Sequence, residues 1–298
     1  MTKRRHLDLE TGEIIEGIVS WVTEEQDKEI KRIYKAKKDN KLFLEQYGSF
    51  IFKENSDKSS KLENGLTDSD IIRTLYLSTY LDYDSNLKYD NGKKMHKGDV
   101  FQVAGVNKNI FYEWYNKLLA NGIIYETSRG VTMNTDYYIK GKLKKNTEYN
   151  RIFIKGLREL YESNIGANQK TLGLVIRLLS YVNTYSNVLC WHPKIKDEKE
   201  AKYITVGELC EELGMEIRNA SKLVRAISKI RVFDGQPLVI FFSDNEHLKD
   251  NYLMFHPYIS YSGKNSDIED VYKMFLILKE RENLPNRKKN KKSLEKLI

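Results

Sequence analysis

An internal repeat constrains the fold more than any other feature of the sequence. Residues 98–124 align without a gap to residues 207–233, with Gly98 opposite Gly207 at the first position. Few residues are identical, but the apolar positions of the two stretches coincide. Because self-similarity within a chain indicates copies of one supersecondary unit, the sequence predicts two modules of similar fold.

Each copy has the pattern of a helix-turn-helix. A short helix is predicted over 99–104 and over 208–213, and it ends at a glycine, Gly105 or Gly214, which can adopt the left-handed conformation. A polar residue and a longer amphipathic helix follow in both copies. In such a motif the first helix buttresses the second, which presents its outer face to a partner.

The longer helix of each copy carries an apolar stripe at helical spacing. The stripe comprises Phe111, Trp114, Tyr115 and Leu118 in the first copy, and Ala220, Leu223, Val224 and Ile227 in the second. Residues at this spacing share one side of a helix, so we expect them in the core. The aromatic members are therefore predicted to be core residues rather than platforms for stacked bases.

A β-hairpin is predicted after each helix-turn-helix, where a winged helix has its wing. The expected strands are 123–125 and 131–133 around the turn 127–130 in the first copy, and 232–233, 238–242 and 252–255 in the second. Amphipathic helices over 67–81 and 170–184 precede the two copies. Each module would thus be a three-helix bundle with a small sheet.

These elements predict a mainly α fold with small β-hairpins, in the α+β class, built as two tandem winged helix-turn-helix domains. The expected boundaries are an N-terminal hairpin, basic helix and loop in 1–65, a first winged-helix domain in 66–145, a second in 150–265, and a C-terminal helix with a basic tail in 266–298.

The overall charge favours a polyanionic partner. The formal net charge is +8 and the pI is about 9.1, which fits a nucleic acid or a membrane surface. No window approaches roughly 18 apolar residues, so no membrane span is expected, and residues 1–10 do not have the pattern of a signal peptide. The only cysteines, Cys190 and Cys210, predict neither a disulfide framework nor a zinc site, and fit a reducing cytoplasm.

Removing the inward stripe leaves polar side chains on the outer faces of the two longer helices. In the first copy they are Asn107, Asn109, Tyr112, Glu113 and Asn116, with Lys108 ambiguous because its counterpart Ile217 is expected to be buried. In the second copy they are Arg218, Asn219, Ser221, Lys222 and Arg225, with Lys229 further along. Arg129 stands at the tip of the first predicted wing.

These side chains have the chemistry that reads duplex DNA. Asparagine pairs with adenine, and arginine pairs with guanine or with phosphate. The second face is the more basic and is expected to supply nonspecific affinity, whereas the nearly neutral first face supplies selectivity or contacts a protein. The predicted partner is double-stranded DNA, bound without a cofactor or a metal ion.

The two ends of the chain carry further predicted elements. A hairpin over 6–21 precedes a helix over 23–39 with a capping box at Thr23 and Gln26. This helix carries Lys28, Lys31, Arg32, Lys35, Lys37 and Lys38, and is either an arm for the DNA backbone or a solvated face. A helix over 267–280 packs on its own domain or on a second copy, which would give a homodimer. The basic run 287–292 is a solvated tail or adds phosphate contacts.

No catalytic motif is found. The Gly-Lys pairs at 92–93, 141–142 and 263–264 lack the first glycine of a P-loop. The five histidines form no His-x-His pair for a nickase with a tyrosine nucleophile. Segment 82–93 lacks the glycine and the final glutamate of a calcium loop. We therefore expect no enzymatic activity, with a nuclease kept as an alternative to test.

The second half of the chain resembles the RepL family of plasmid replication proteins from low-GC Gram-positive bacteria. The similar pieces are Phe153-Ile154-Lys155, the helix around 172–183, residues 204–209, residues 252–263 and the opening stretch 8–15. RepL proteins are usually shorter and have one winged helix, so the module at about 66–142 is additional. The resemblance implies recognition of a replication origin and recruitment of host replication proteins.

Two classes of function follow. The first is a DNA-binding protein of a plasmid or phage, located in the cytoplasm on plasmid or nucleoid DNA. It is either a replication initiator or a transcription regulator, and it acts with host replication or transcription proteins. The second is a winged-helix factor that binds a host enzyme, which the nearly neutral first face favours.

Overall fold

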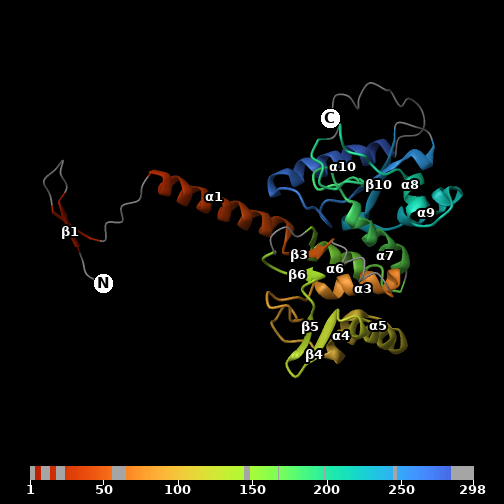
Figure 1. Cartoon of the computed structure of the whole chain (residues 1–298), viewed down its shortest axis with the longest axis horizontal. Helices are drawn as coiled ribbons and strands as arrows, with labels where there is room; N and C mark the ends of the chain where they lie inside the picture. Colours follow the sequence, from red (N-terminus) through yellow and green to blue (C-terminus); the bar gives the residue numbers. More distant parts are fainter. Residues whose placement is uncertain are drawn as a thin grey trace. The chain divides into compact units, whose positions relative to one another are not determined.

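The computed structural model describes residues 4–7, 14–17, 24–55, 65–143, 148–166, 168–197, 199–243 and 247–282 (Figure 1). The chain divides into two compact units, residues 1–46 and 47–298. The structure is 48% helical and 19% strand, and its strands form small antiparallel sheets. This is an α+β protein, with more strand than the mainly α fold expected from the sequence.

The first unit contains a hairpin and most of a long helix. Strands β1 (Arg4–Leu7) and β2 (Ile14–Gly17) pair antiparallel, with Leu7 opposite Ile14. Helix α1 (Glu24–Tyr47) extends beyond the expected end at 39. The predicted hairpin turn and the predicted cap Thr23 lie outside the described residues.

A three-stranded antiparallel sheet joins three separate stretches of the second unit. Strand β3 (Phe50–Glu54) lies between β6 (Tyr138–Ile139) and β7 (Tyr149–Phe153). Neither β3 nor β7 was predicted from the sequence. Their pairing is non-local, and no short-range turn signal marks it. Of the loop expected at 54–65, residues 56–64 lie outside the described part of the chain.

The first repeat lies in a module of three helices and a hairpin, residues 68–133, which we call the first module. Its elements are α3 (Asp68–Ser78), α4 (Lys97–Ala104), α5 (Lys108–Ala120), β4 (Ile124–Thr127) and β5 (Gly130–Met133). Strand β5 also pairs with the segment before α4, because Leu87 N–H donates to Val131 O over 2.9 Å. The hairpin thus gains a third, short strand.

The second repeat lies in a module with the same order of elements, residues 169–255, which we call the second module. Its elements are α7 (Gln169–Arg177), the 3₁₀ turn η1 (Leu178–Tyr181), α8 (Val206–Glu212), η2 (Ile217–Asn219), α9 (Ala220–Ile227), β10 (Val239–Phe242) and β11 (Tyr252–Phe255). Leu189 N–H donates to Leu253 O over 3.0 Å. This bond repeats the link between the early segment and the second hairpin strand.

Some boundaries in the second module differ from those predicted. Its first helix was expected over 170–184, but the α-helix ends at Arg177 and η1 ends at Tyr181. Val182 then bridges Leu189 in extended conformation. A short pair, β8 (Arg231–Val232) and β9 (Gln236–Pro237), and three 3₁₀ turns complete the connections; the turns are η3 (Phe233–Gly235), η4 (Leu248–Asp250) and η5 (Asn265–Asp267).

The predicted apolar stripes are buried, except that Val224 of α9 is half-buried. Phe111, Trp114, Tyr115 and Leu118 of α5 have at most 2% of their surface exposed, and Ala220, Leu223 and Ile227 of α9 are also buried. Trp114 donates its indole N–H to Thr74 Oγ1 over 3.0 Å. The expectation that these aromatic residues belong to the core is confirmed.

Helix α10 (Ile268–Glu282) packs on strand β10 of its own chain. Phe275 is fully buried and Ile268 nearly so. Two arrangements were left open for this helix, packing on its own domain or on a second copy. Its apolar face packs on its own domain. The basic run 287–292 lies outside the described residues.

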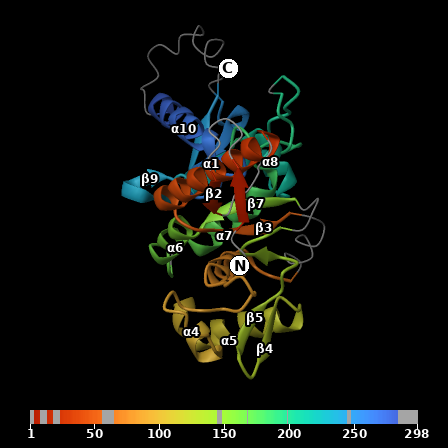
Figure 2. The same cartoon turned by 90° about the vertical axis from the view of Figure 1, so that its left-hand side faces the viewer.

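The first helices of the two modules cross at very close range. A Cβ added at Gly173 of α7 would lie 1.7 Å from the main-chain oxygen of Asp68 in α3. Around this point Arg177 pairs with Asp68 over 3.1 Å and Arg73 donates to Gln169 over 3.1 Å. In both views α3 and α7 lie between the hairpin of the first module and the helices α8 and α9 (Figures 1 and 2).

Helix α6 (Ile154–Glu162) strengthens this joint. Its Tyr161 ring stacks on Tyr76 of α3 with ring centroids 4.0 Å apart. The Tyr161 hydroxyl donates to the main-chain oxygen of Ala104, the last residue of α4, over 2.8 Å. Arg158 stacks on Tyr80 at 4.2 Å and donates to Thr79. The sequence analysis did not predict α6 as a helix.

Gly173→Ala should destabilise the protein strongly. The added methyl group has no room against the α3 backbone, so the two helices must separate, at a cost of about 3 kcal/mol or more. Gly98→Ala in α4 is the matched control, because a Cβ there meets nothing within 4 Å, and it should be neutral or slightly stabilising. Urea unfolding followed by circular dichroism measures both. Equal midpoints for the two variants would contradict the close crossing.

His256 should make stability depend on pH. The side chain is fully buried, and burial lowers its pKa from the usual 6.5 to about 3. Between these values the unfolded chain binds a proton that the folded chain does not. Stability should therefore fall as the pH drops below 6.5, by up to about 1.4 kcal/mol per unit. His256→Gln should flatten this slope, which urea unfolding at a series of pH values measures.

Candidate nucleic-acid interface

The outward residues predicted on α5 are exposed. These residues are Asn107, Lys108, Asn109, Tyr112 and Asn116. Asn107 is the N-cap, and its side-chain oxygen accepts from Ile110 N–H over 3.0 Å. Its amide N–H groups remain available at the N-terminus of the helix, where partial positive charge favours an anion.

Two lysines flank the Tyr112 ring. The ammonium of Lys97 lies 5.1 Å from the ring centroid, and that of Lys108 lies 6.0 Å from it. Lys97 is the first residue of α4. It was not among the predicted outward residues because this helix was expected to begin at 99. Glu113 is paired with Lys117 over 2.8 Å. The α5 face is therefore more basic than its own sequence suggested.

The structure corrects one burial assignment and reveals apolar exposure near α5. Ile217 was expected to be buried, yet 42% of its surface is exposed. The position of Lys108 opposite Ile217 in the repeat is therefore no argument that Lys108 is buried. Ile110, one turn into α5, is 43% exposed. Both residues lie at the start of the outer helix of their module.

Arg129 lies in the two-residue turn between β4 and β5 and is exposed. Its backbone N–H donates to Thr127 Oγ1 over 3.2 Å, which orders the turn. The next residue, Gly130, has φ +121°, and a Cβ there would lie 2.7 Å from Met95 O. Glycine is needed at this point because the hairpin passes against the segment before α4.

The outward face of α9 is basic. Arg218, Ser221, Lys222, Arg225 and Lys229 are exposed, and Asn219 is half-buried. The helix begins with the 3₁₀ turn η2, so the predicted set is shared between two kinds of helix. Arg218 forms an ion pair with Glu216, which lowers the net charge of this part of the face while leaving the Arg218 side chain at the surface.

An open hollow of about 610 Å³ lies at the start of this face. It is lined by Gly214, Met215, Glu216, Arg218, Asn219 and Lys222. Gly214 has φ +64°, the left-handed conformation predicted for it, and it turns the chain from α8 into η2. The turn therefore places Arg218, Asn219 and Lys222 around one concave surface of a size that admits a phosphate group.

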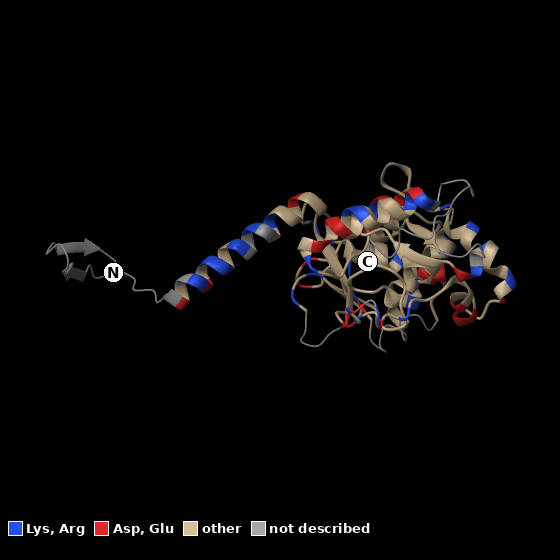
Figure 3. Cartoon of the chain, turned by 90° about the horizontal axis from the view of Figure 1, so that it is seen from above, with Lys and Arg blue, Asp and Glu red and all other residues tan. Residues whose placement is uncertain are grey.

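Helix α1 carries a further basic surface in the first unit. Lys28, Lys31, Arg32, Lys35, Lys38 and Lys41 are exposed, and Lys and Arg recur along its length (Figure 3). The side chain of Lys37 is outside the described set. Arg32 pairs with Glu29 over 2.8 Å and Lys41 with Glu45 over 3.7 Å, both at exposed positions where such pairs stabilise little.

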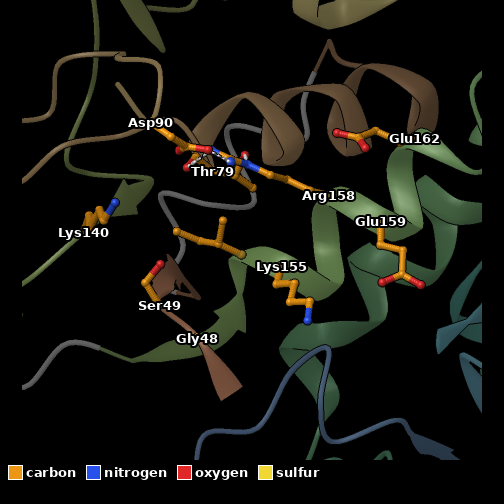
Figure 4. Close-up of a pocket in the computed structure, with 10 residues that line it drawn as sticks. Gly48, Ser49, Thr79, Asp90, Lys140, Lys155, Arg158, Glu159 and Glu162 are labelled. Carbon is orange, nitrogen blue, oxygen red and sulfur yellow. Dashed lines mark hydrogen bonds and ion pairs between the residues drawn. The ribbon is translucent and has the colours of Figure 1, made fainter. Parts of the chain in front are cut away.

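A second pocket, of about 510 Å³, has mixed charge (Figure 4). Three basic residues, Lys140, Lys155 and Arg158, share it with Asp90, Glu159 and Glu162. Arg158 is held by Asp90 over 2.7 Å and by Thr79. Burial, and then the charge of Arg158, lowers the pKa of Lys140. The charges in this pocket balance, and Arg158 is occupied in joining α6 to the segment after α3.

The described residues hold no group of three His, Cys, Asp or Glu side chains that could bind a metal ion. Asp82, from the loop compared with a calcium site, instead accepts backbone N–H bonds from Asp84 and Asn86. Cys190 and Cys210 are buried free thiols. Among the residues described, no helix is long and apolar enough to cross a bilayer.

Comparisons with protein families, with curated proteins and with solved structures found no match to this chain.

Proposed function

We propose that this chain binds double-stranded DNA through two winged-helix modules. This proposal rests on the observation that both repeats have the same order of elements. In each, a helix is followed by an extended segment, a helix, a left-handed glycine, an outer helix and a hairpin, and the extended segment pairs with the second hairpin strand. This order and pairing supports a winged-helix assignment, in which the outer helix would enter the major groove.

The chemistry of the two outer helices supports DNA as the ligand. Both buried stripes face the core, so the polar residues opposite them are available to a groove. Asn109 and Asn116 of α5 suit adenine, and Arg218 and Arg225 of α9 suit guanine or phosphate. Arg129 at the wing tip suits a phosphate or the minor groove. The net charge of +8 adds a favourable field.

The setting proposed is the DNA of a plasmid or phage. The resemblance of 151–263 to RepL proteins suggests initiation of replication at an origin, with host replication proteins as further partners. A transcription regulator would need the same two DNA-reading modules. Mapping the binding site against the origin and promoters of its own locus separates these two roles.

A second candidate function is protein binding by the first module. The observation that favours it is apolar exposure around α5, where Ile110 is 43% exposed, Tyr125 of the wing 49% and Phe101 of α4 36%. Such side chains mark a protein interface where they form a contiguous patch. In that case the second module alone would bind DNA.

The triple variant Arg218→Ala, Lys222→Ala and Arg225→Ala should lose most DNA affinity, by about 100-fold or more at 100 mM salt, because counterion release and base contacts are both removed. Fluorescence anisotropy with a duplex from its own locus measures this. The control removes the same charge elsewhere, at Lys264, Lys273 and Arg281 around α10, and should change affinity little. Equal losses in both variants would indicate only bulk electrostatics.

Wild-type affinity should also fall steeply between about 50 and 200 mM salt, as expected when several phosphates are neutralised. An affinity that does not depend on salt concentration, or the absence of binding to any duplex, would rule out the proposed function. Incubation of supercoiled DNA with the protein and magnesium or manganese tests the nuclease alternative, for which nicking is the positive outcome.

Asn109→Ala distinguishes the two roles of the first module. If α5 reads bases, the variant should lose about tenfold in affinity and relax its preference at one A·T pair, because a bidentate contact is removed. Ile110→Ala is the control at the neighbouring position and should leave DNA affinity unchanged. Unaltered affinity and base preference in Asn109→Ala would favour protein binding by this face.

A further inference from the structure

We propose that a single chain reads an asymmetric, two-part duplex site at one fixed spacing. This inference rests on the proposed function and goes beyond it, because two modules on one chain are usually free to adapt to different spacings. Here the two outer helices belong to one compact unit, residues 47–298.

The rigidity comes from an unbroken series of packed helices. Helix α5 is held on α3 by the bond from Trp114 to Thr74. Helix α3 crosses α7 at the contact of Gly173 with Asp68, where even a methyl group has no room. Helix α7 in turn packs on α9. A change in the distance between the outer helices would require one of these contacts to open.

Polar contacts around the crossing oppose sliding and rotation. Arg73 is buried and bonds to Asp70 over 2.9 Å and to Gln169 over 3.1 Å. Tyr76 donates to Glu162 over 2.9 Å. Separating the two helices would leave the buried Arg73 with one bond fewer, which is costly in a low-dielectric interior. The close crossing therefore has one preferred geometry.

The described parts of the connection between the modules, residues 134–143 and 148–166, are also structured. Strands β6 and β7, which follow the first module, both pair with β3 in one sheet. Arg151 of β7 is buried and donates to the main-chain oxygens of Tyr261 and Gly263 over 2.8 and 3.1 Å. These parts are thus tied to strand β3 and, through Arg151, to the segment after β11.

The two outer faces differ in chemistry, so the two half-sites should differ in sequence. The α5 face offers asparagines and Tyr112, which suit A·T pairs, and the α9 face offers Arg218 and Arg225, which suit G·C pairs. In Figure 1 both α5 and α9 lie on the right-hand side of the second unit, as contact with one duplex requires. The site for one chain is accordingly not a palindrome.

The test begins with a duplex selected by the full-length protein from a random pool. Hydroxyl-radical footprinting should show two protected patches per bound chain, with a one-to-one stoichiometry by mass photometry. The α9 variant described above should lose one patch. A variant with Asn109→Ala, Tyr112→Ala and Asn116→Ala should lose the other.

The decisive measurement inserts about 5 or about 10 base pairs between the two patches, that is, half a helical turn or one turn. A rigid body tolerates neither, so both insertions should lower affinity by about 100-fold, to that of one half-site. Full affinity with the 10-base-pair insertion, or with both, would show a flexible joint and overturn the inference while leaving DNA binding intact.

The remaining outcomes also decide the matter. A single protected patch, two chains per site, or one chain bridging two separate duplexes would overturn the inference but not DNA binding. Failure to select any duplex would instead reject the proposed function, and the inference with it.

Discussion

The structure depends on the crossing of α3 and α7 at Gly173. Each of these helices is the first helix of a module and supports the outer helix of that module. Because their backbones touch where Gly173 has no side chain, the two modules share one core instead of two cores joined by a linker. Close approach of this kind increases dispersion contacts and excludes water from the polar groups beside it.

Buried charge accompanies this crossing. Asp70 caps the first turn of α3, accepts from Arg73 and lies 3.3 Å from Lys117 of α5. A buried ion pair gains little net stability against its desolvation, but breaking it leaves an uncompensated charge. The group therefore specifies how α3, α5 and α7 meet more than it strengthens their contact. Apolar packing by Leu75, Tyr115 and their neighbours supplies the stabilisation.

The two outer helices have similar inward faces and different outward faces. Their inward stripes remain apolar, since the core of each module needs them. Their outward faces differ, with amides and tyrosine on α5 and arginine and lysine on α9. Apolar side chains are exposed in both modules, at Ile110 and Tyr125 in the first and at Ile217 in the second. The same order of elements thus carries two outward surfaces of different chemistry.

The sequence by itself determined the local features: the helices of both repeats, the left-handed glycines Gly105 and Gly214, the buried stripes and the outward polar sets. These follow from periodicity and turn chemistry, which act over a few residues. Tertiary structure decided the rest, namely the β3 sheet, helix α6, Lys97 beside Tyr112 and the crossing at Gly173. Each depends on contacts between residues far apart in the chain, and no short-range pattern encodes them. Gly173 is the clearest example. It lies within a helical pattern, and glycine is needed there only because the backbone of another helix lies against it.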